Sequence, residues 1–88
     1  MKVEFKKSFV KDLEQVRDKS LKERVRQAIE RVEKAQTLQE VENVRKLRGG
    51  ERYYRIRIGD YRLGLVLERD TVIFVRFLHR KDVYRYFP

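Results

Sequence analysis

The C-terminal half of the chain concentrates arginine side chains in a pattern that predicts two consecutive β-hairpins. Arg55, Arg57 and Arg62 fall on one face of the first hairpin, because side chains alternate between the faces of a strand. Gly59-Asp60 fits a two-residue primed turn, which places Arg57 opposite Arg62. The same turn places Arg55 opposite Gly64. Like charges that face each other across a ladder repel, so we expect an anion, most simply phosphate, to bind here.

The position of Arg80 depends on the second turn, between Glu68 and Thr71. A turn of two or four residues places Arg80 on the apolar face of the sheet. A three-residue loop or a β-bulge moves it to the face that carries Arg62. The sequence leaves both arrangements open.

His79 and Tyr84 complete the side chains that could act on a phosphate ester. Arginine stays protonated, so the arginines can bind phosphate and stabilise charge but are poor bases. Histidine titrates near neutrality. If the site cleaves a phosphate ester, we therefore expect either that His79 is the general base or that the cleavage rate depends on little general base catalysis. His79 could equally do no more than end a strand. Tyr84 could anchor the tail in the core, stack on a base of single-stranded RNA or donate a proton.

Composition limits the class of protein. The 88 residues predict one domain, residues 1–88, with one core. Lys and Arg number 23 against 14 Asp and Glu, and this net charge of +9 favours polyanions or an acidic protein as partners. With no cysteine and one histidine we expect no disulfide, no zinc site and no cofactor. The chain shows neither a signal peptide nor the run of about 20 apolar residues that spans a membrane, so we expect a cytoplasmic protein.

The first half is predicted to hold one strand and two helices. Residues 2–6 alternate apolar and charged side chains, as in a short strand with one buried face. Ser8 is a candidate N-cap for the first helix, and Ser20-Leu21-Lys22-Glu23 has the form of a capping box for the second. The side chains expected in the core are Leu13, Val16, Val25, Ile29, Val32, Leu63 and Leu65.

The second half is predicted to be mainly strand. Residues 37–40 predict a single helical turn before a strand at 44–48, which Gly49-Gly50 ends. Residues 72–78 suit a central strand, and 81–88 form a short tail with about one helical turn. These elements predict an α+β domain in which an N-terminal strand and a helical hairpin pack on a mainly antiparallel sheet of about four to five strands.

Four short motifs resemble the RelE branch of the RelE/ParE toxins, which belong to bacterial and archaeal toxin-antitoxin pairs. The motifs are Lys46-Leu47-Arg48-Gly49, Tyr54-Arg55-Ile56-Arg57, Gly59-Asp60-Tyr61-Arg62-Leu63 and His79-Arg80-Lys81-Asp82-Val83-Tyr84. Each motif alone is short, but their order and spacing extend the resemblance over nearly the whole chain.

The resemblance implies a metal-independent endoribonuclease that enters the ribosomal A site. There it would cut mRNA by attack of a ribose 2′-hydroxyl on the adjacent phosphate, leaving a 2′,3′-cyclic phosphate. The family's catalytic positions then fall on Arg55, Arg57, Arg62, Arg80 and Tyr84, with His79 beside them. The residues that we expect to act in catalysis are Arg57, Arg62, His79, Arg80 and Tyr84. The substrate-binding positions fall on Arg55, Arg57, Lys46, Arg48 and Lys81. One lysine of the 54–57 motif is thought to act as base in the best-known members, and both lysines of that motif are arginine here.

The resemblance also implies the partners, which are the ribosome, mRNA and a cognate acidic antitoxin. We expect the antitoxin to cover or displace the tail 81–88, with the toxin monomeric inside a heteromeric complex. Two alternatives stay open: a poison of DNA gyrase, as in the ParE branch, and a basic module that binds RNA without cutting it. The ParE branch generally lacks the arginine and tyrosine set found here, which favours cleavage.

Overall fold

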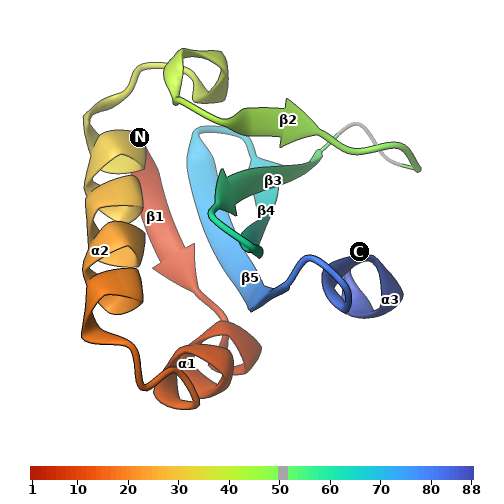
Figure 1. Ribbon diagram of the computed structural model, residues 1–88. Helices are drawn as coiled ribbons and strands as arrows, with labels where there is room; N and C mark the ends of the chain where they lie inside the picture. Colours follow the sequence, from red (N-terminus) through yellow and green to blue (C-terminus); the bar gives the residue numbers. More distant parts are fainter. Residues whose placement is uncertain (50–51) are drawn as a thin grey trace.

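The computed structural model describes residues 1–49 and 52–88. A five-stranded sheet stands between a helical hairpin and a short C-terminal helix (Figure 1). The elements are β1 (Lys2–Phe5), α1 (Lys7–Glu14), α2 (Lys19–Lys34), the 3-10 turn η1 (Leu38–Glu40), β2 (Val44–Lys46), β3 (Tyr53–Ile58), β4 (Tyr61–Glu68), β5 (Thr71–His79) and α3 (Val83–Tyr86). Across the sheet the order is β1-β5-β4-β3-β2, and only the β1–β5 pair among the described strands is parallel. The predicted α+β class is confirmed.

The first hairpin has the predicted register. Arg57 pairs with Arg62 and Arg55 pairs with Gly64 across β3 and β4. Gly59 begins the turn with a φ of 57°, a left-handed conformation that glycine adopts without a Cβ clash. The two arginines therefore face each other, as the alternation of side chains required.

A β-bulge in the second hairpin decides the face of Arg80. The turn between β4 and β5 has two residues, but the register shifts between Gly64 and Leu65. Arg62 consequently pairs with Leu78. Because Leu78 and Arg80 are two positions apart, Arg80 extends the face that carries Arg62.

The turn between β4 and β5 is strained at Arg69, whose φ is 56°. The left-handed conformation destabilises a residue with a Cβ by about 1 to 2 kcal/mol. Glycine avoids this strain but destabilises the folded state by about 0.5 to 1 kcal/mol, because it loses more conformational entropy on folding. We expect Arg69→Gly to raise the free energy of unfolding by about 0.5 to 1 kcal/mol, or a few degrees in Tm by calorimetry. Asp70→Gly is the control, because φ at Asp70 is not positive and glycine there should lower Tm. Equal shifts in the two variants would contradict this account.

Both predicted N-caps were wrong. The Ser8 hydroxyl lies inside α1 and donates to the Val75 carbonyl at 2.6 Å, so it ties α1 to β5 and caps no helix. α2 begins after Asp18, whose carboxylate accepts the Leu21 N–H at 3.2 Å. A charged acceptor at the positive end of the helix dipole outcompetes the serine hydroxyl predicted at Ser20.

Most of the other predicted elements are confirmed with small shifts of boundary. The helical turns at 38–40 and 83–86 are present, and β5 lies between β1 and β4. β2 ends at Lys46, before the predicted limit at Arg48. Of the predicted terminator, Gly49 has a φ of 91° and Gly50 lies outside the described residues. Phe5 is 47% exposed, so β1 buries its apolar face only in part.

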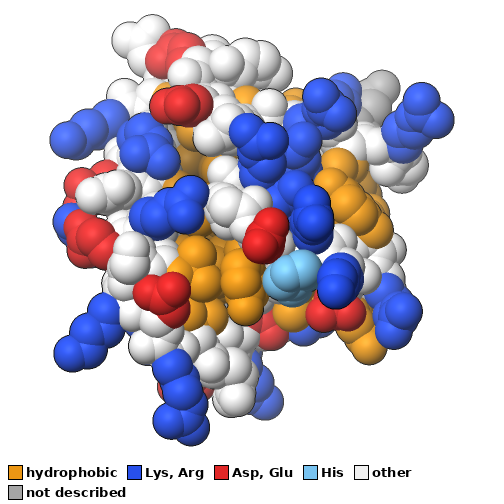
Figure 2. All heavy atoms as spheres, in the orientation of Figure 1, with side chains coloured by type: hydrophobic (Ala, Val, Ile, Leu, Met, Phe, Trp, Pro, Cys, Tyr) orange, Lys and Arg blue, Asp and Glu red, His pale blue; other side chains and the backbone are white. Residues whose placement is uncertain are grey.

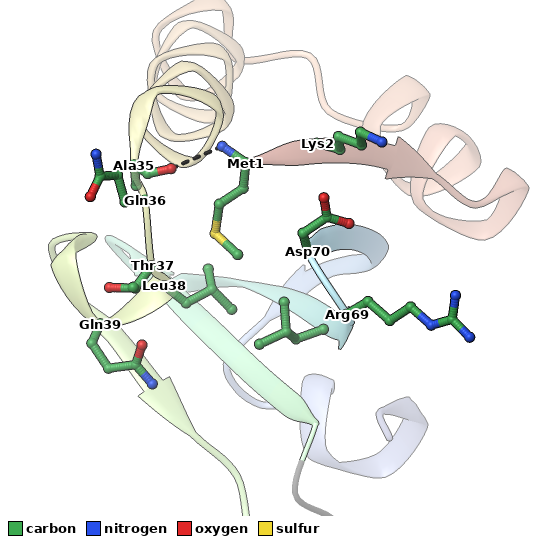
Figure 3. A pocket seen from close by; sticks show the side chains of 10 residues that line it. Met1, Lys2, Ala35, Gln36, Thr37, Leu38, Gln39, Arg69 and Asp70 are labelled. Carbon is green, nitrogen blue, oxygen red and sulfur yellow. Dashed lines mark hydrogen bonds between the residues drawn. The ribbon is translucent and has the colours of Figure 1, made fainter.

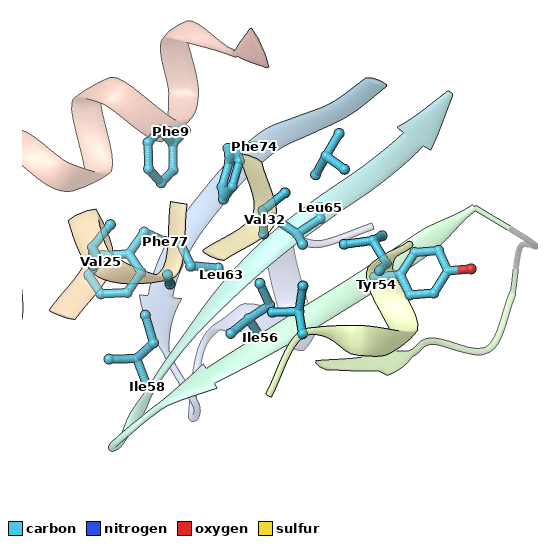
Figure 4. Packing of buried hydrophobic residues seen from close by; sticks show 14 residues of the cluster. Phe9, Val25, Val32, Tyr54, Ile56, Ile58, Leu63, Leu65, Phe74 and Phe77 are labelled. Atoms are coloured by element: carbon cyan, nitrogen blue, oxygen red, sulfur yellow. The ribbon is translucent and has the colours of Figure 1, made fainter. Parts of the chain in front are cut away.

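The core fills the space between the sheet and the two longer helices (Figure 4). Phe74 and Phe77 of β5 are its largest fully buried side chains, and the Phe9 ring of α1 lies 5.5 Å from that of Phe74. Of the side chains predicted to be core, four are buried: Val25, Val32, Leu63 and Leu65. The other three pack against this cluster while partly exposed: Leu13, Val16 and Ile29. One face of β3 and β4 packs in this core. The opposite face, which carries Arg55, Arg57 and Arg62, lies outside it.

Candidate active site

A hollow of about 420 Å³ lies at the turn between β3 and β4, and we call it the arginine hollow. Its lining consists of Arg24, Asn43, Arg57, Gly59, Asp60, Arg62 and Arg80. Four guanidinium groups thus surround one carboxylate, an excess of positive charge that suits a phosphate. Figure 2 shows Lys and Arg side chains gathered beside β3 on this side of the molecule.

Arg62 is held in place by the turn that it follows. Its Nη1 donates to the carbonyls of Gly59 and Tyr61, both at 2.9 Å. The side chain is half-buried, and Arg57, its partner across the ladder, is exposed. The Nε and Nη2 donors of Arg62 make no hydrogen bond to the residues that the structure describes, so they remain free for an anion.

Arg80 reaches the same hollow from the end of β5. Its backbone N–H donates to the Asp60 carbonyl at 2.7 Å, which fixes the strand end against the turn. The guanidinium Nε lies 3.9 Å from Asp60 Oδ1, and the two side chains are 60% and 70% exposed. An ion pair this long and this exposed is weak, so a phosphate can replace the carboxylate as partner of Arg80.

Two arginines of this surface were not among the predicted site residues. Arg24 belongs to α2, and a Cβ placed on Gly59 would lie 3.2 Å from its Nη1, so its guanidinium covers the turn. Its sequence context is an ordinary charged helix face, which gives no signal of this contact. Arg45 pairs with Arg55 on the outer face of β2. Alternation could have found it, since Val44 points toward the core.

Arg55 lies beside the hollow and does not line it. Its Nη1 donates to the Asn43 carbonyl at 2.9 Å, and the same carbonyl accepts the backbone N–H of Arg57 at 3.2 Å. The Arg55 Nε is buried and has no hydrogen-bond partner within residues 1–49 and 52–88. Arg55 is therefore more enclosed than Arg57.

The structure does not bring His79 into the arginine hollow. His79 pairs with Tyr61, and the two rings meet edge to face at 5.4 Å between centroids. Both belong to a different hollow, of about 540 Å³, that Asp12 and Phe77 also line. The His79 Nδ1 accepts the Lys81 N–H at 3.1 Å, which assigns the ring proton to Nε2. Since Arg80 follows His79 directly, the two side chains leave β5 on opposite faces.

The three other predicted substrate contacts also lie outside the hollow. Lys46 pairs with Tyr54, whose side chain is buried in the core, so Lys46 shares the face opposite the arginines. Arg48 follows β2 and is exposed. Lys81 is exposed in the link from β5 to α3.

Tyr84 does not anchor the tail in the core, because it is 57% exposed on α3. Its neighbours Val83 and Phe87 anchor the tail instead; they are 0% and 3% exposed but lie outside the core cluster. Tyr84 therefore keeps its ring and hydroxyl available to a partner molecule.

Arg76 shares the outer face with the hollow but is already neutralised. Its Nε and Nη2 donate to the Asp12 carboxylate at 2.7 and 3.1 Å. These hydrogen bonds raise the pKa of Arg76 above its ordinary value. Its guanidinium also lies 5.6 Å from the centre of the Tyr86 ring. Arg76 thus binds α1 to the sheet and is not free for phosphate.

A larger hollow, of about 680 Å³, contains none of the predicted site residues (Figure 3). It lies between Met1, η1 and the turn at Arg69, and its lining is largely apolar. The Met1 ammonium donates to the Ala35 carbonyl at 2.9 Å beside it. Among the described residues no group of His, Cys, Asp and Glu could hold a metal ion, and no helix is long and apolar enough to cross a membrane.

Comparison with known proteins assigns this small basic fold to a class of toxins. The family model described as ParE toxin of type II toxin-antitoxin system, parDE, matches residues 3–84. Toxin RelE3 of Methanocaldococcus jannaschii is 44% identical over 89 residues, which cover 100% of both chains. The chain therefore belongs to the RelE/ParE family of type II toxins, which confirms the resemblance seen in its motifs.

Solved structures show the same fold. The match to the RelB-RelE antitoxin-toxin complex from Methanococcus jannaschii has a TM-score of 0.82 and 41% identity, over 97% of this chain and 99% of that chain. The archaeal RelE-RelB complex from Pyrococcus horikoshii OT3 matches with a TM-score of 0.75 and 24% identity, over 93% and 97%. The intact E. coli RelBE complex matches with 0.71 and 18%, over 89% and 94%. The last two matches show the fold alone.

Proposed function

We propose that this toxin is a cytoplasmic, ribosome-dependent endoribonuclease that cuts mRNA in the A site. The arginine hollow is the observation that carries the proposal. Arg57, Arg62 and Arg80 are the predicted catalytic arginines, and all three line it together with Arg24. Donors placed around a developing negative charge stabilise a transition state, typically by about 10² to 10³ in rate for each donor.

The proposed reaction is a transfer within the RNA. The 2′-hydroxyl oxygen bonds to the phosphorus of the adjacent phosphate while the bond from phosphorus to the 5′ oxygen breaks. The hydroxyl loses its proton and the 5′ oxygen gains one, which gives a 2′,3′-cyclic phosphate and a 5′-hydroxyl. Negative charge grows on the phosphorane oxygens, and the arginine forks donate to them. The guanidinium groups supply the positive charge, so the proposal needs no metal.

The geometry favours a small contribution from general base catalysis by the chain. His79 lies on the other face of β5 from Arg80, and its Nδ1 is already occupied by the Lys81 N–H. Tyr84 is the proposed group that stacks on a base or protonates the 5′ oxygen. The basic side chains outside the hollow are proposed to contact RNA phosphates without reading sequence; they are Arg55, Lys46, Arg48 and Lys81.

Replacing His79 with alanine tests this division of roles. We expect the single-turnover cleavage rate to change by less than about tenfold and its pH profile to keep its shape, because removing a true general base costs about 10² to 10⁴. Measurements across pH 5 to 9 on pre-bound ribosomes separate chemistry from binding. A loss of 10² or more, with a flattened profile, would return His79 to the role of base.

Mapping of 3′ ends on programmed ribosomes tests the function itself. With the wild-type toxin, new ends should appear at the A-site codon and carry a cyclic phosphate. Naked mRNA of the same sequence should stay intact, since the ribosome positions the substrate. Ribosome binding without new ends would favour a module that only binds RNA.

A second candidate is a poison of DNA gyrase, favoured by the ParE description of the matching family model. A supercoiling assay with purified gyrase decides it. Inhibition there, with intact mRNA on ribosomes, would replace the first proposal.

We propose an acidic antitoxin as the physiological partner, with the toxin monomeric within a heteromeric toxin-antitoxin complex. Two observations support it: the similar chain from M. jannaschii was solved as a complex with RelB, and the net charge is +9.

A further inference from the structure

Gly64 has no conformational need to be glycine. It lies inside β4, the middle strand of the sheet, and its φ is not in the left-handed region. Glycine inside a strand usually weakens the strand, and it often marks a place where another group approaches the backbone closely. We therefore expect another group to pack closely over the backbone of Gly64.

The occupant is the ring of Phe87. A Cβ placed on Gly64 would lie 2.8 Å from both Cγ and Cδ2 of that ring, closer than carbon atoms can approach without a shift. Phe87 is 3% exposed and meets the Tyr53 ring edge to face at 5.9 Å. The missing side chain thus forms a notch in the outer face of the sheet that receives the last aromatic residue of the tail.

The notch determines where Tyr84 lies. The Phe87 N–H donates to the Val83 carbonyl at 2.8 Å, and Val83 is fully buried, so α3 is fixed at both ends. Tyr84, between these two anchors, is 57% exposed. Gly64 is two positions from Arg62 on the same face of β4, so the notch lies one row from the arginine hollow.

We propose that Gly64 and Phe87 are positioning residues that hold Tyr84 beside the arginine hollow. In its catalytic part this inference rests on the proposed cleavage of RNA. A methyl group at position 64 displaces the ring and moves α3 with it, and a misplacement of about 1 Å in a reacting group can cost 10² in rate.

The placement of the tail can be measured apart from catalysis. The chain has no cysteine, so Arg85→Cys, an exposed site on α3, takes a single nitroxide label. We expect Gly64→Ala and Phe87→Ala each to make the label more mobile in its EPR spectrum. In the Phe87→Ala background Gly64→Ala should add nothing, because the ring that it displaces is gone. Phe5→Ala, which removes an aromatic ring from β1, is the control and should leave the label unchanged.

Cleavage by the unlabelled variants tests the effect on Tyr84. Gly64→Ala should slow single-turnover cleavage by about 10- to 100-fold at unchanged ribosome affinity. In a Tyr84→Ala background it should cost less than about twofold, whereas general damage to the fold would still lower the rate. A label that stays ordered in Gly64→Ala, or effects of Gly64→Ala and Phe87→Ala that add, would overturn the inference. If Gly64→Ala makes the label mobile but the wild-type toxin does not cleave RNA, the packing of Phe87 on Gly64 is supported. The proposed function alone is then refuted.

Discussion

Arg62→Ala and Arg80→Ala should each slow single-turnover cleavage of ribosome-bound mRNA by about 10² to 10³-fold. The two guanidinium groups reach one hollow from different strands, and neither is used up by a strong ion pair in the described structure. Tm should stay near that of the wild type, since Arg80 is exposed and the hydrogen bonds of Arg62 within residues 1–49 and 52–88 go to turn carbonyls.

Arg31→Ala is the matched control, because it removes the same charge from an exposed position of α2 outside the arginine hollow. Its rate should fall by less than about twofold. Arg62→Lys should lie between Arg62→Ala and the wild type, because lysine keeps the charge but lacks the planar fork that suits phosphate. Wild-type rates in both alanine variants would remove the arginine hollow from the mechanism.

The parts of the site that sequence predicted are those governed by local rules. Alternation along β3 and the Gly59-Asp60 turn are enough to place Arg57 opposite Arg62. The same alternation, extended to β2, would have placed Arg45 beside Arg55. Residues on one hairpin are a few positions apart, so their relation does not depend on the rest of the fold.

The parts that sequence could not settle depend on contacts between distant elements. The face of Arg80 follows from a bulge after Gly64, which no local pattern announces. Arg24 reaches the hollow because α2 packs across the sheet, and a helical charge gives no sign of that. His79 and Arg80 are adjacent in a shared motif, yet strand geometry sends them to opposite faces. Adjacency in a motif is therefore weak evidence for a shared site when the motif runs along a strand.

The free edge of β5 shows another such long-range contact. β1 pairs with β5 only as far as Phe74, and α1 then takes over the edge. The Ser8 hydroxyl donates to the Val75 carbonyl at 2.6 Å, and the Asp12 carboxylate accepts the Phe77 N–H at 2.9 Å. Side chains of α1 thus bond to backbone groups of β5 beyond the end of β1. These groups are then not available to pair with a strand of another chain.

Asp12→Asn should consequently lower the free energy of unfolding by about 2 to 3 kcal/mol. The asparagine keeps the shape of the side chain but loses the charge that binds Arg76, and the side chains of this pair are only 13% and 25% exposed. At this chain length the loss corresponds to a fall in Tm of about 10 °C or more, measurable by calorimetry. Glu23→Gln removes a carboxylate from the exposed pair with Arg26 and should leave Tm unchanged.

The pH dependence of this loss follows from the raised pKa of Arg76. A group whose folded pKa is raised adds stability that is fully present below its unfolded pKa, which for arginine lies far above neutral pH, and that is lost only as pH rises through the still higher folded value. The difference in Tm between wild type and Asp12→Asn should therefore be the same at pH 6 and pH 9. A difference that vanished at either pH, or a Tm unchanged by Asp12→Asn, would show that the edge of β5 is held by the apolar contacts of Phe9 and not by this ion pair.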